Sequence, residues 1–382
     1  MSDDINKKYK NVAQIIIKNG ILPFPINETL LEILKFFITP EDLDFLLAFK
    51  RKASQTMEEL IKSTKMSENE ILEKADVLAK RGLIFNQPSS AGIMVYRLLP
   101  LFSVGLFEYT FMKKLEFSEK EKKIAELFKK LFNEERDIVQ ERYDTFAPLF
   151  KQTPPVDRTI PLLKDEKGNK IEISVNKDVE VPIEKIIPAN QVEKIIDKFK
   201  DIAVSHCFCR QHKDLLNKSC KITDIRENCF TFGKSARHLV NQKFARMISK
   251  KEALEILNKS VEIGLVHKVY HPNSDIYKDE TSICNCCKDC CGTFEMWKMG
   301  AIPMVNATNY LASINLELCV GCGTCVEKCP VDAIRLSEDG KSELNPNWCI
   351  GCGICAHFCP ESAISLLEGP RIVSVPPPRL RS

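Results

Sequence analysis

The first 206 residues of this 382-residue chain contain no cysteine, whereas the remainder holds all 17. Secreted disulfide scaffolds are short chains with cysteines spread along their length, so this clustering argues against that class. No stretch approaches the roughly 18 uncharged apolar residues that a membrane-spanning helix requires, and the first residues include no apolar signal segment. The sequence also has no G-x-G-x-x-G loop after a strand and no P-loop, so it predicts no built-in nucleotide site. We expect a cytoplasmic protein.

Helix signals dominate residues 1–150. Thr56 can cap one helix, and Ser67 together with Glu70 forms a capping box that opens a longer helix, which ends at Gly82. Two short strand-like runs, beginning at residues 83 and 94, then flank a segment rich in turn-forming residues. This order of helix, turn, helix and hairpin resembles a winged-helix domain.

The second of these helices would be the recognition helix if the domain bound DNA. Its acidic side chains outnumber its basic ones: Glu68, Glu70, Glu73 and Asp76 stand against Lys74, Lys80 and Arg81. Such a balance suits a phosphate backbone poorly. Winged helices also dock proteins, and a fold alone does not decide function, so we expect that nucleic acid is not the partner.

A duplicated cysteine motif lies near the end of the chain. Residues 319–330 read CVGCGTCVEKCP, and residues 349–360, thirty positions later, read CIGCGICAHFCP. Each run has the spacing C-x2-C-x2-C-x3-C-P, which lets a tight loop present three thiolates to one [4Fe–4S] cluster. A pair of zinc knuckles is the alternative, but zinc would need fewer cysteines and no trailing proline.

The two runs resemble the bacterial dicluster ferredoxin family, in which the fourth cysteine of each run ligates the cluster of the other run. The resemblance implies two [4Fe–4S] clusters. By position, Cys319, Cys322, Cys325 and Cys359 would hold one cluster. The other would be held by Cys349, Cys352, Cys355 and Cys329.

Nine further cysteines match no ferredoxin run. They are Cys207, Cys209, Cys220 and Cys229 in one group, and Cys284, Cys286, Cys287, Cys290 and Cys291 in another. Two cysteines that are adjacent in sequence cannot easily both ligate the same iron. The adjacent pairs of the second group therefore suggest that some of its thiolates face one metal centre and others face a second. The first group could form a third [4Fe–4S] cluster, with the second completing it or holding one more. A zinc or mixed site, and thiols that are redox-active or merely structural, stay open as alternatives.

These features predict an α+β multidomain protein. Its expected parts are a winged-helix-like domain at 1–150, a connector with a hairpin at 151–190, a cysteine-rich middle domain at 191–312, a ferredoxin-like dicluster module at 313–368 and an extended tail at 369–382. The connector is marked by Pro154, Pro155, Pro161, Pro182 and Pro188. The whole arrangement resembles a group of archaeal and bacterial 4Fe–4S proteins with a winged-helix-like N-terminus. An anaerobic host fits this chemistry.

Charge is distributed unevenly among these parts. The module at 313–368 has 3 basic against 8 acidic side chains, whereas residues 151–312 have 26 basic against 21 acidic ones. Complementary charge of this kind favours docking between redox proteins. The leading hypothesis is an electron-transfer protein, or a subunit of a redox complex, that relays single electrons between a protein donor and a protein acceptor.

Two other functions remain open at this stage. The middle domain could hold a catalytic third cluster, which would make the protein a reductase. The winged helix and the clusters together could instead form an iron–sulfur-sensing transcription regulator. The sequence does not decide whether the protein is an enzyme, although it favours an electron-transfer component of an oxidoreductase system.

Overall fold

The computed structural model describes residues 3–89, 91–155, 157–175, 191–272, 275–276 and 278–380. The chain divides into two compact units. The first consists of Met1–Asp137, Ser205–Ser219 and Lys234–Met247, and the second of Ile138–Val204, Cys220–Gly233 and Ile248–Ser382. The residues of the predicted middle domain, 191–312, are therefore divided between the two units.

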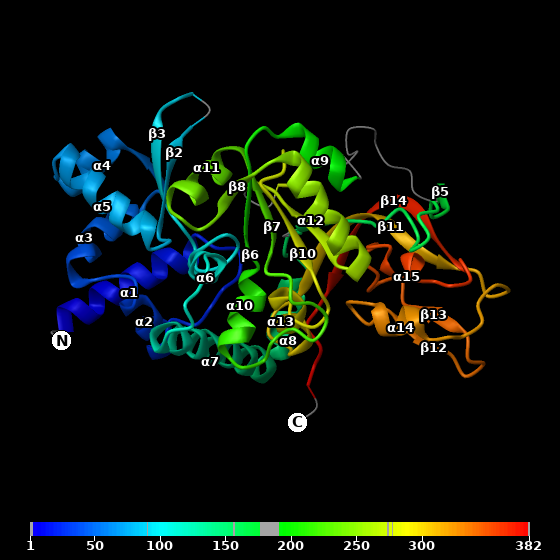
Figure 1. Cartoon of the computed structure of the whole chain (residues 1–382). Helices are drawn as coiled ribbons and strands as arrows, with labels where there is room; N and C mark the ends of the chain where they lie inside the picture. The colour runs from blue at the N-terminus through cyan, green and yellow to red at the C-terminus, as the bar shows by residue number, and fades with distance from the viewer. Residues whose placement is uncertain are drawn as a thin grey trace. The chain divides into compact units, whose positions relative to one another are not determined.

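Helices make up most of the first unit (Figure 1). They are α1 (Asp3–Lys18), α2 (Glu28–Lys35), α3 (Leu43–Leu47), α4 (Met57–Thr64), α5 (Glu68–Lys80), α6 (Leu106–Met112), α7 (Glu119–Glu141), α10 (Phe208–Leu215) and α11 (Gly233–Asn241), with the 3-10 turns η1 (Pro40–Asp42) and η2 (Ala48–Lys50). Of these helices, α7 and α11 each cross a boundary between the units. A small sheet has the order β1-β3-β2, from β1 (Ser54–Thr56), β2 (Ile84–Pro88) and β3 (Met94–Leu98).

Side-chain caps set the boundaries of α4 and α5. The Thr56 hydroxyl accepts a hydrogen bond from the Glu59 amide at 3.3 Å, and the Ser67 hydroxyl accepts one from the Glu70 amide at 3.4 Å. In both cases the glutamate carboxylate accepts the amide of the capping residue in return, which completes a capping box. Gly82 follows α5 in the left-handed conformation, with φ of 79°. The predicted start and end of this helix pair are confirmed.

A neutral histidine is buried in the first unit. The His238 ring is completely buried, and its centroid lies 4.5 Å from that of Phe85 and 6.0 Å from that of Tyr109. Neither ring nitrogen has a hydrogen-bond partner among the described residues. Burial therefore lowers the pKa of His238 to about 4.

This histidine makes the first unit sensitive to acid. The unfolded chain binds a proton at His238 below pH about 6.5, whereas the folded chain resists it down to about 4. His238 thus contributes stability that is present above the unfolded pKa and is lost as the pH falls toward the folded one. Between pH 7 and 4 we expect the unfolding free energy of the native protein to drop by about 3 kcal/mol more than that of His238→Leu. Denaturant unfolding at both pH values measures this difference, and parallel pH profiles would contradict it.

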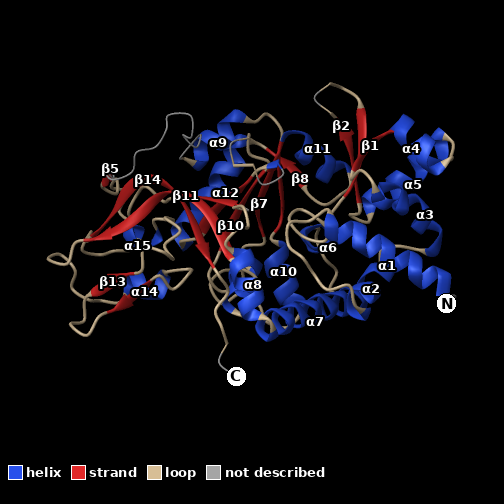
Figure 2. Ribbon diagram, turned by 180° about the vertical axis from the view of Figure 1, so that it is seen from behind, coloured by secondary structure: helices blue, strands red, loops and turns tan. Residues whose placement is uncertain are grey.

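A nine-stranded sheet forms the core of the second unit, in the order β5-β14-β11-β4-β9-β10-β7-β6-β8. Its strands are β4 (Asp157–Ile160), β5 (Ile173–Val175), β6 (Ile202–His206), β7 (Glu227–Phe232), β8 (Arg246–Ile248), β9 (Val266–Tyr270), β10 (Ser282–Cys286), β11 (Met304–Ile314) and β14 (Ile364–Val375). Two helices, α9 (Val192–Lys198) and α12 (Lys250–Ile263), lie side by side along it (Figure 2). They pack apolar residues such as Ile195, Ile196 and Leu257 against Phe230 and Ile283 of the strands. Helices α8 (Tyr143–Phe150) and α13 (Gly292–Lys298) also belong to this unit.

One interior strand of this sheet lies in the segment that the sequence indicates as a connector. Strand β4 is fully buried between β11 and β9. The sequence pattern did not reveal it because two of its four residues, Asp157 and Arg158, are charged. Each charge is paired inside the protein: Asp157 with Lys268 at 2.6 Å and Arg158 with Glu280 at 3.1 Å. A tight turn at Gly168 follows, and Pro182 and Pro188 lie outside the described residues.

The duplicated cysteine motif lies between the two longest strands of the sheet. The chain leaves β11, forms α14 (Thr324–Lys328), the hairpin of β12 (Ile334–Leu336) and β13 (Ser342–Leu344), and α15 (Ile354–His357), and returns as β14. Strands β11 and β14 pair in antiparallel fashion from Met304–Val375 to Ile314–Ile364. Strand β14 therefore continues into the predicted tail, whose described residues after Val375 lie beyond the sheet. No helix in the described part of the chain is long and apolar enough to cross a membrane.

Candidate metal centres

Four of the repeat cysteines surround one hollow in the surface. Cys319, Cys322, Cys325 and Cys359 line about 310 Å³ of empty space that opens to solvent, together with Thr324, Ser342 and Glu361. Three of these cysteines come from the first run and the fourth from the second run. This is the set that the ferredoxin resemblance assigns to one cluster. Cys322 is exposed, Cys359 is half-buried, and the other two are buried.

The remaining four repeat cysteines lie together in the interior. Burial raises the pKa of the Cys355 thiol, and the nearby charges of Cys349, Cys352 and Cys329 raise it further. Burial likewise raises the pKa of Cys352, again with contributions from Cys329 and Cys349. Cys325, of the other set, also acts on Cys355, so the two groups of four are neighbours.

The two groups differ in their surroundings. A hydrogen bond from the Ser342 backbone is the main cause that lowers the pKa of Cys319. A hydrogen bond with the Thr324 side chain is the main cause that lowers the pKa of Cys322. Both thiols therefore ionise more readily than an isolated cysteine, which suits them to bind metal. Burial instead raises the pKa of Cys325 in the same group and of Cys352 and Cys355 in the interior group, so these thiolates need a cation to stabilise them.

Backbone geometry repeats between the two runs. Gly323 and Gly353 adopt left-handed conformations and open α14 and α15, which carry Cys325 and Cys355 in their first turns. The Ala333 amide donates a hydrogen bond to Cys329 Sγ at 3.2 Å, and the equivalent Ala363 amide donates one to Cys359 Sγ at 3.3 Å. Amide-to-sulfur hydrogen bonds of this kind support and tune iron–sulfur clusters. The donor set, the hollow and these amides fit two [4Fe–4S] clusters.

Only glycine fits at position 351 without steric strain. Its φ is +64°, and a Cβ there would lie 2.2 Å from the Tyr310 carbonyl oxygen and 2.5 Å from Thr308 Oγ1. We expect Gly351→Ala to destabilise the protein by about 3 kcal/mol or more, because the backbone must move away from β11. Gly323→Ala is the matched control, since its φ is +79° but nothing lies within 4 Å of its Cβ, and its expected cost is about 1 kcal/mol. Denaturant midpoints of the two variants compare these costs, and equal midpoints would be inconsistent with a steric role of β11.

The nine other cysteines lie on several elements of the two units. Cys207 and Cys209 lie at the start of α10 in the first unit, and the other seven lie in the second unit. In the second unit Cys220 joins Cys287 and Cys290, whose sulfurs all lie within 4.8 Å of one another. The structure thus brings Cys220 close to two cysteines of the second predicted group.

The other thiols of the second unit gather around the end of strand β10. Cys284 is the cross-strand partner of Cys229 on β7, and hydrogen bonds with Cys229 and then Cys286 raise its pKa. Cys286 in turn interacts with Cys284 and with Cys291. Since side chains alternate along a strand, Cys284 and Cys286 share one face. Neighbouring cysteines such as Cys286 and Cys287 thus belong to different groups.

Sequence reasoning missed a charged residue beside this second group. Lys268 is buried, forms an ion pair with Asp157 and lies over the Phe294 ring at 4.9 Å from its centroid. Burial alone would lower the pKa of Lys268, but Asp157, Cys291 and Cys286 raise it above its usual range. The residue stands in a short strand with no motif around it, so no sequence signal marks it.

Comparisons with known proteins agree with the C-terminal part of this picture. A family described as 4Fe-4S dicluster domain matches residues 312–366. A probable ferredoxin of Methanosarcina thermophila is 53% identical over 30 residues, which cover 8% of this chain and 52% of that protein. Protein Pixie of Drosophila melanogaster is 33% identical over 90 residues, which cover 23% of this chain and 13% of its own. No solved structure matches.

The chain spans about half of one of these relatives and a small fraction of the other. The likeness therefore concerns the module and not the whole protein. Residues 312–366 form a ferredoxin-like 4Fe–4S dicluster domain within a multidomain chain of helices and strands. A domain of this kind supports an iron–sulfur electron-transfer role.

Proposed function

We propose that the protein is an electron-transfer protein, or a subunit of a redox complex, that relays single electrons through two [4Fe–4S] clusters in residues 313–368. The observation that carries this proposal is the hollow lined by Cys319, Cys322, Cys325 and Cys359, because it joins cysteines from both halves of the repeat. In this proposal these four hold one cluster, and Cys329, Cys349, Cys352 and Cys355 hold the other. When bound, such clusters supply reversible one-electron transfer.

In such a relay the interior and the outer cysteine groups would have different roles. The interior group excludes water, since Cys349, Cys352 and Cys355 are all buried. The outer group includes the exposed Cys322, so an electron donor or acceptor could approach on that side. The acidic surface of the module, with 8 acidic against 3 basic side chains, favours a partner with a basic docking patch.

The surface of α5 gives little support to the hypothesis of a DNA-binding regulator. In our proposal residues 1–150 form a winged-helix-like domain that binds protein. On α5 the exposed side chains include Leu72 and Val77, at 45% and 41% exposure, and the Asp76–Lys80 ion pair at 2.6 Å. A helix with exposed apolar side chains and more acidic than basic ones offers little attraction for a phosphate backbone.

Stoichiometric electron delivery tests the proposal. The protein is purified without oxygen, reduced chemically, freed of reductant and mixed with cytochrome c, a basic one-electron acceptor. We expect about two electrons per chain to be delivered, at a rate that falls as salt rises. Delivery of no electrons by protein that contains iron would overturn the proposal. A gel shift with genomic DNA fragments tests the regulator hypothesis separately.

A further inference from the structure

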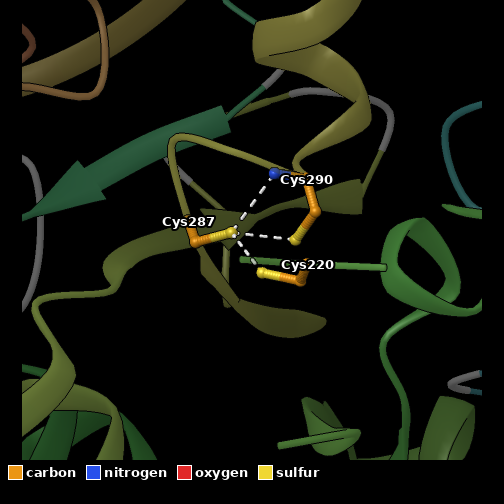
Figure 3. A group of neighbouring side chains, drawn as sticks. All are labelled: Cys220, Cys287 and Cys290. Carbon is orange, nitrogen blue, oxygen red and sulfur yellow. Dashed lines mark hydrogen bonds between the residues drawn. The ribbon is translucent and has the colours of Figure 1, made fainter. Parts of the chain in front are cut away.

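Three thiols outside the ferredoxin-like module converge on one point (Figure 3). Cys287 Sγ lies 2.8 Å from Cys290 Sγ and 3.5 Å from Cys220 Sγ. Among the described residues, this is the one group of three or more metal-binding side chains whose ligand atoms all lie within 4.8 Å of one another. No three of the eight module cysteines come this close.

The chain brings these thiols together from distant positions. Cys287 and Cys290 form a C-x2-C turn between β10 and α13, and the Cys290 amide donates a hydrogen bond to Cys287 Sγ at 3.3 Å. Cys220 lies 67 positions before Cys287 in the sequence. The Asp289 carboxylate accepts a hydrogen bond from the Lys221 amide at 2.9 Å, which holds the loop with Cys220 against the turn.

The spacing of the sulfurs distinguishes a single ion from a cluster. A tetrahedral zinc ion with Zn–S bonds of about 2.3 Å places its sulfurs roughly 3.8 Å apart. A cubane presents separate irons to its cysteines, so their sulfurs stand farther apart. Among the described residues no three of the eight module cysteines have sulfurs that all lie within 4.8 Å of one another. The Sγ–Sγ distances of 2.8 and 3.5 Å are shorter than this zinc spacing, so the three thiols are too close together for a cubane and nearer to the spacing around one ion.

The burial of Cys287 and Cys290 also favours a bound metal ion. Cys287 and Cys290 are 2% and 1% exposed and pack against Leu265. Two thiols so close together in an apolar setting can ionise only if a cation compensates their charge. Soft thiolate ligands select zinc over hard cations such as magnesium or calcium.

We propose that Cys220, Cys287 and Cys290 bind one zinc ion through three thiolates. The site is separate from the clusters of the module and does not depend on the proposed electron transfer. Cys220 is partly exposed, whereas the other two thiols are buried. The ion would join the loop with Cys220 to the turn before α13.

Metal analysis of the full-length protein tests this inference. The protein is produced with both iron and zinc supplied, purified without oxygen and analysed for both metals. We expect about one zinc per chain, lost in Cys287→Ser with the iron content unchanged. Cys319→Ala is the matched control, and it should lose about four irons and keep the zinc.

Because Cys287 is buried and its replacement could unfold the turn, Cys220→Ser at a partly exposed position is the second variant. Cobalt replacement provides the second readout: the wild-type chain should show a thiolate-to-cobalt charge-transfer band that is much weaker in Cys220→Ser. Loss of about four irons from Cys287→Ser would overturn the inference in favour of a cluster. A zinc-free protein with a Cys287–Cys290 disulfide would also overturn it. Either result leaves the iron of the module, and so the proposed function, to be judged separately.

Discussion

Replacing Cys355 by alanine is expected to lower the iron content of the purified chain from about eight atoms to about four. Cys355 lies in the buried group with Cys329, Cys349 and Cys352. A cluster there would lose one of four thiolate ligands in a site that water cannot easily reach, so the whole cluster should be lost. Iron and acid-labile sulfide analysis of the folded variant measures the change.

Double variants test how the eight cysteines are divided. Cys329→Ala removes a ligand of the same group although it belongs to the first run, so adding it to Cys355→Ala should cause no further loss of iron. Adding Cys359→Ala should instead remove the remaining iron, because Cys359 lines the hollow of the outer group. If Cys329→Ala and Cys355→Ala together removed all iron, the assignment of the fourth cysteines across the two runs would be wrong.

Lys268→Met is expected to destabilise the protein by about 3–5 kcal/mol. Lys268 Nζ lies 2.6 Å from Asp157 Oδ2, and both side chains are 2% exposed. Removing the lysine leaves the Asp157 carboxylate buried without its partner, and this desolvation cost is much larger than the benefit of an exposed ion pair. Chemical unfolding of the variant, followed by circular dichroism under anaerobic conditions, measures the loss.

An exposed pair with similar geometry is the control for this prediction. Lys298 lies 2.7 Å from Asp332, but these side chains are 33% and 56% exposed. Lys298→Met should cost no more than about 1 kcal/mol. The double variant Lys268→Met/Asp157→Leu should recover most of the loss, since it removes both buried charges. Equal destabilisation by the two methionine variants would contradict the role of burial.

The sequence predicted those parts of the fold that local chemistry determines. Thr56 and Ser67 cap helices wherever the chain folds, because each bonds an amide only three residues away. The repeat at 319–360 is equally local, since its spacing by itself arranges three thiolates around a loop. Residues 312–366 accordingly match a dicluster family, as the motif indicated.

The features that could not be predicted from the sequence depend on contacts between residues far apart in the chain. Strand β4 looks like part of a polar connector until Asp157 and Arg158 meet Lys268 and Glu280, each more than 100 residues away. The grouping of the nine other cysteines depends on the same kind of contact. Spacing does not show that Cys220 lies beside Cys287 and Cys290, which the fold brings to it. Strand alternation explains why adjacent cysteines separate, but it does not identify their partners.

In our proposal the eight cysteines of residues 313–368 hold two [4Fe–4S] clusters. The most direct test is the iron and acid-labile sulfide content per chain of anaerobically purified protein, together with electron paramagnetic resonance of the reduced form. We expect about eight iron atoms and about eight sulfides per chain, together with two interacting paramagnetic centres. These signals should be lost when the repeat cysteines are replaced. Intact, folded protein with fewer than about four irons per chain, or with zinc in place of iron at these cysteines, would contradict it.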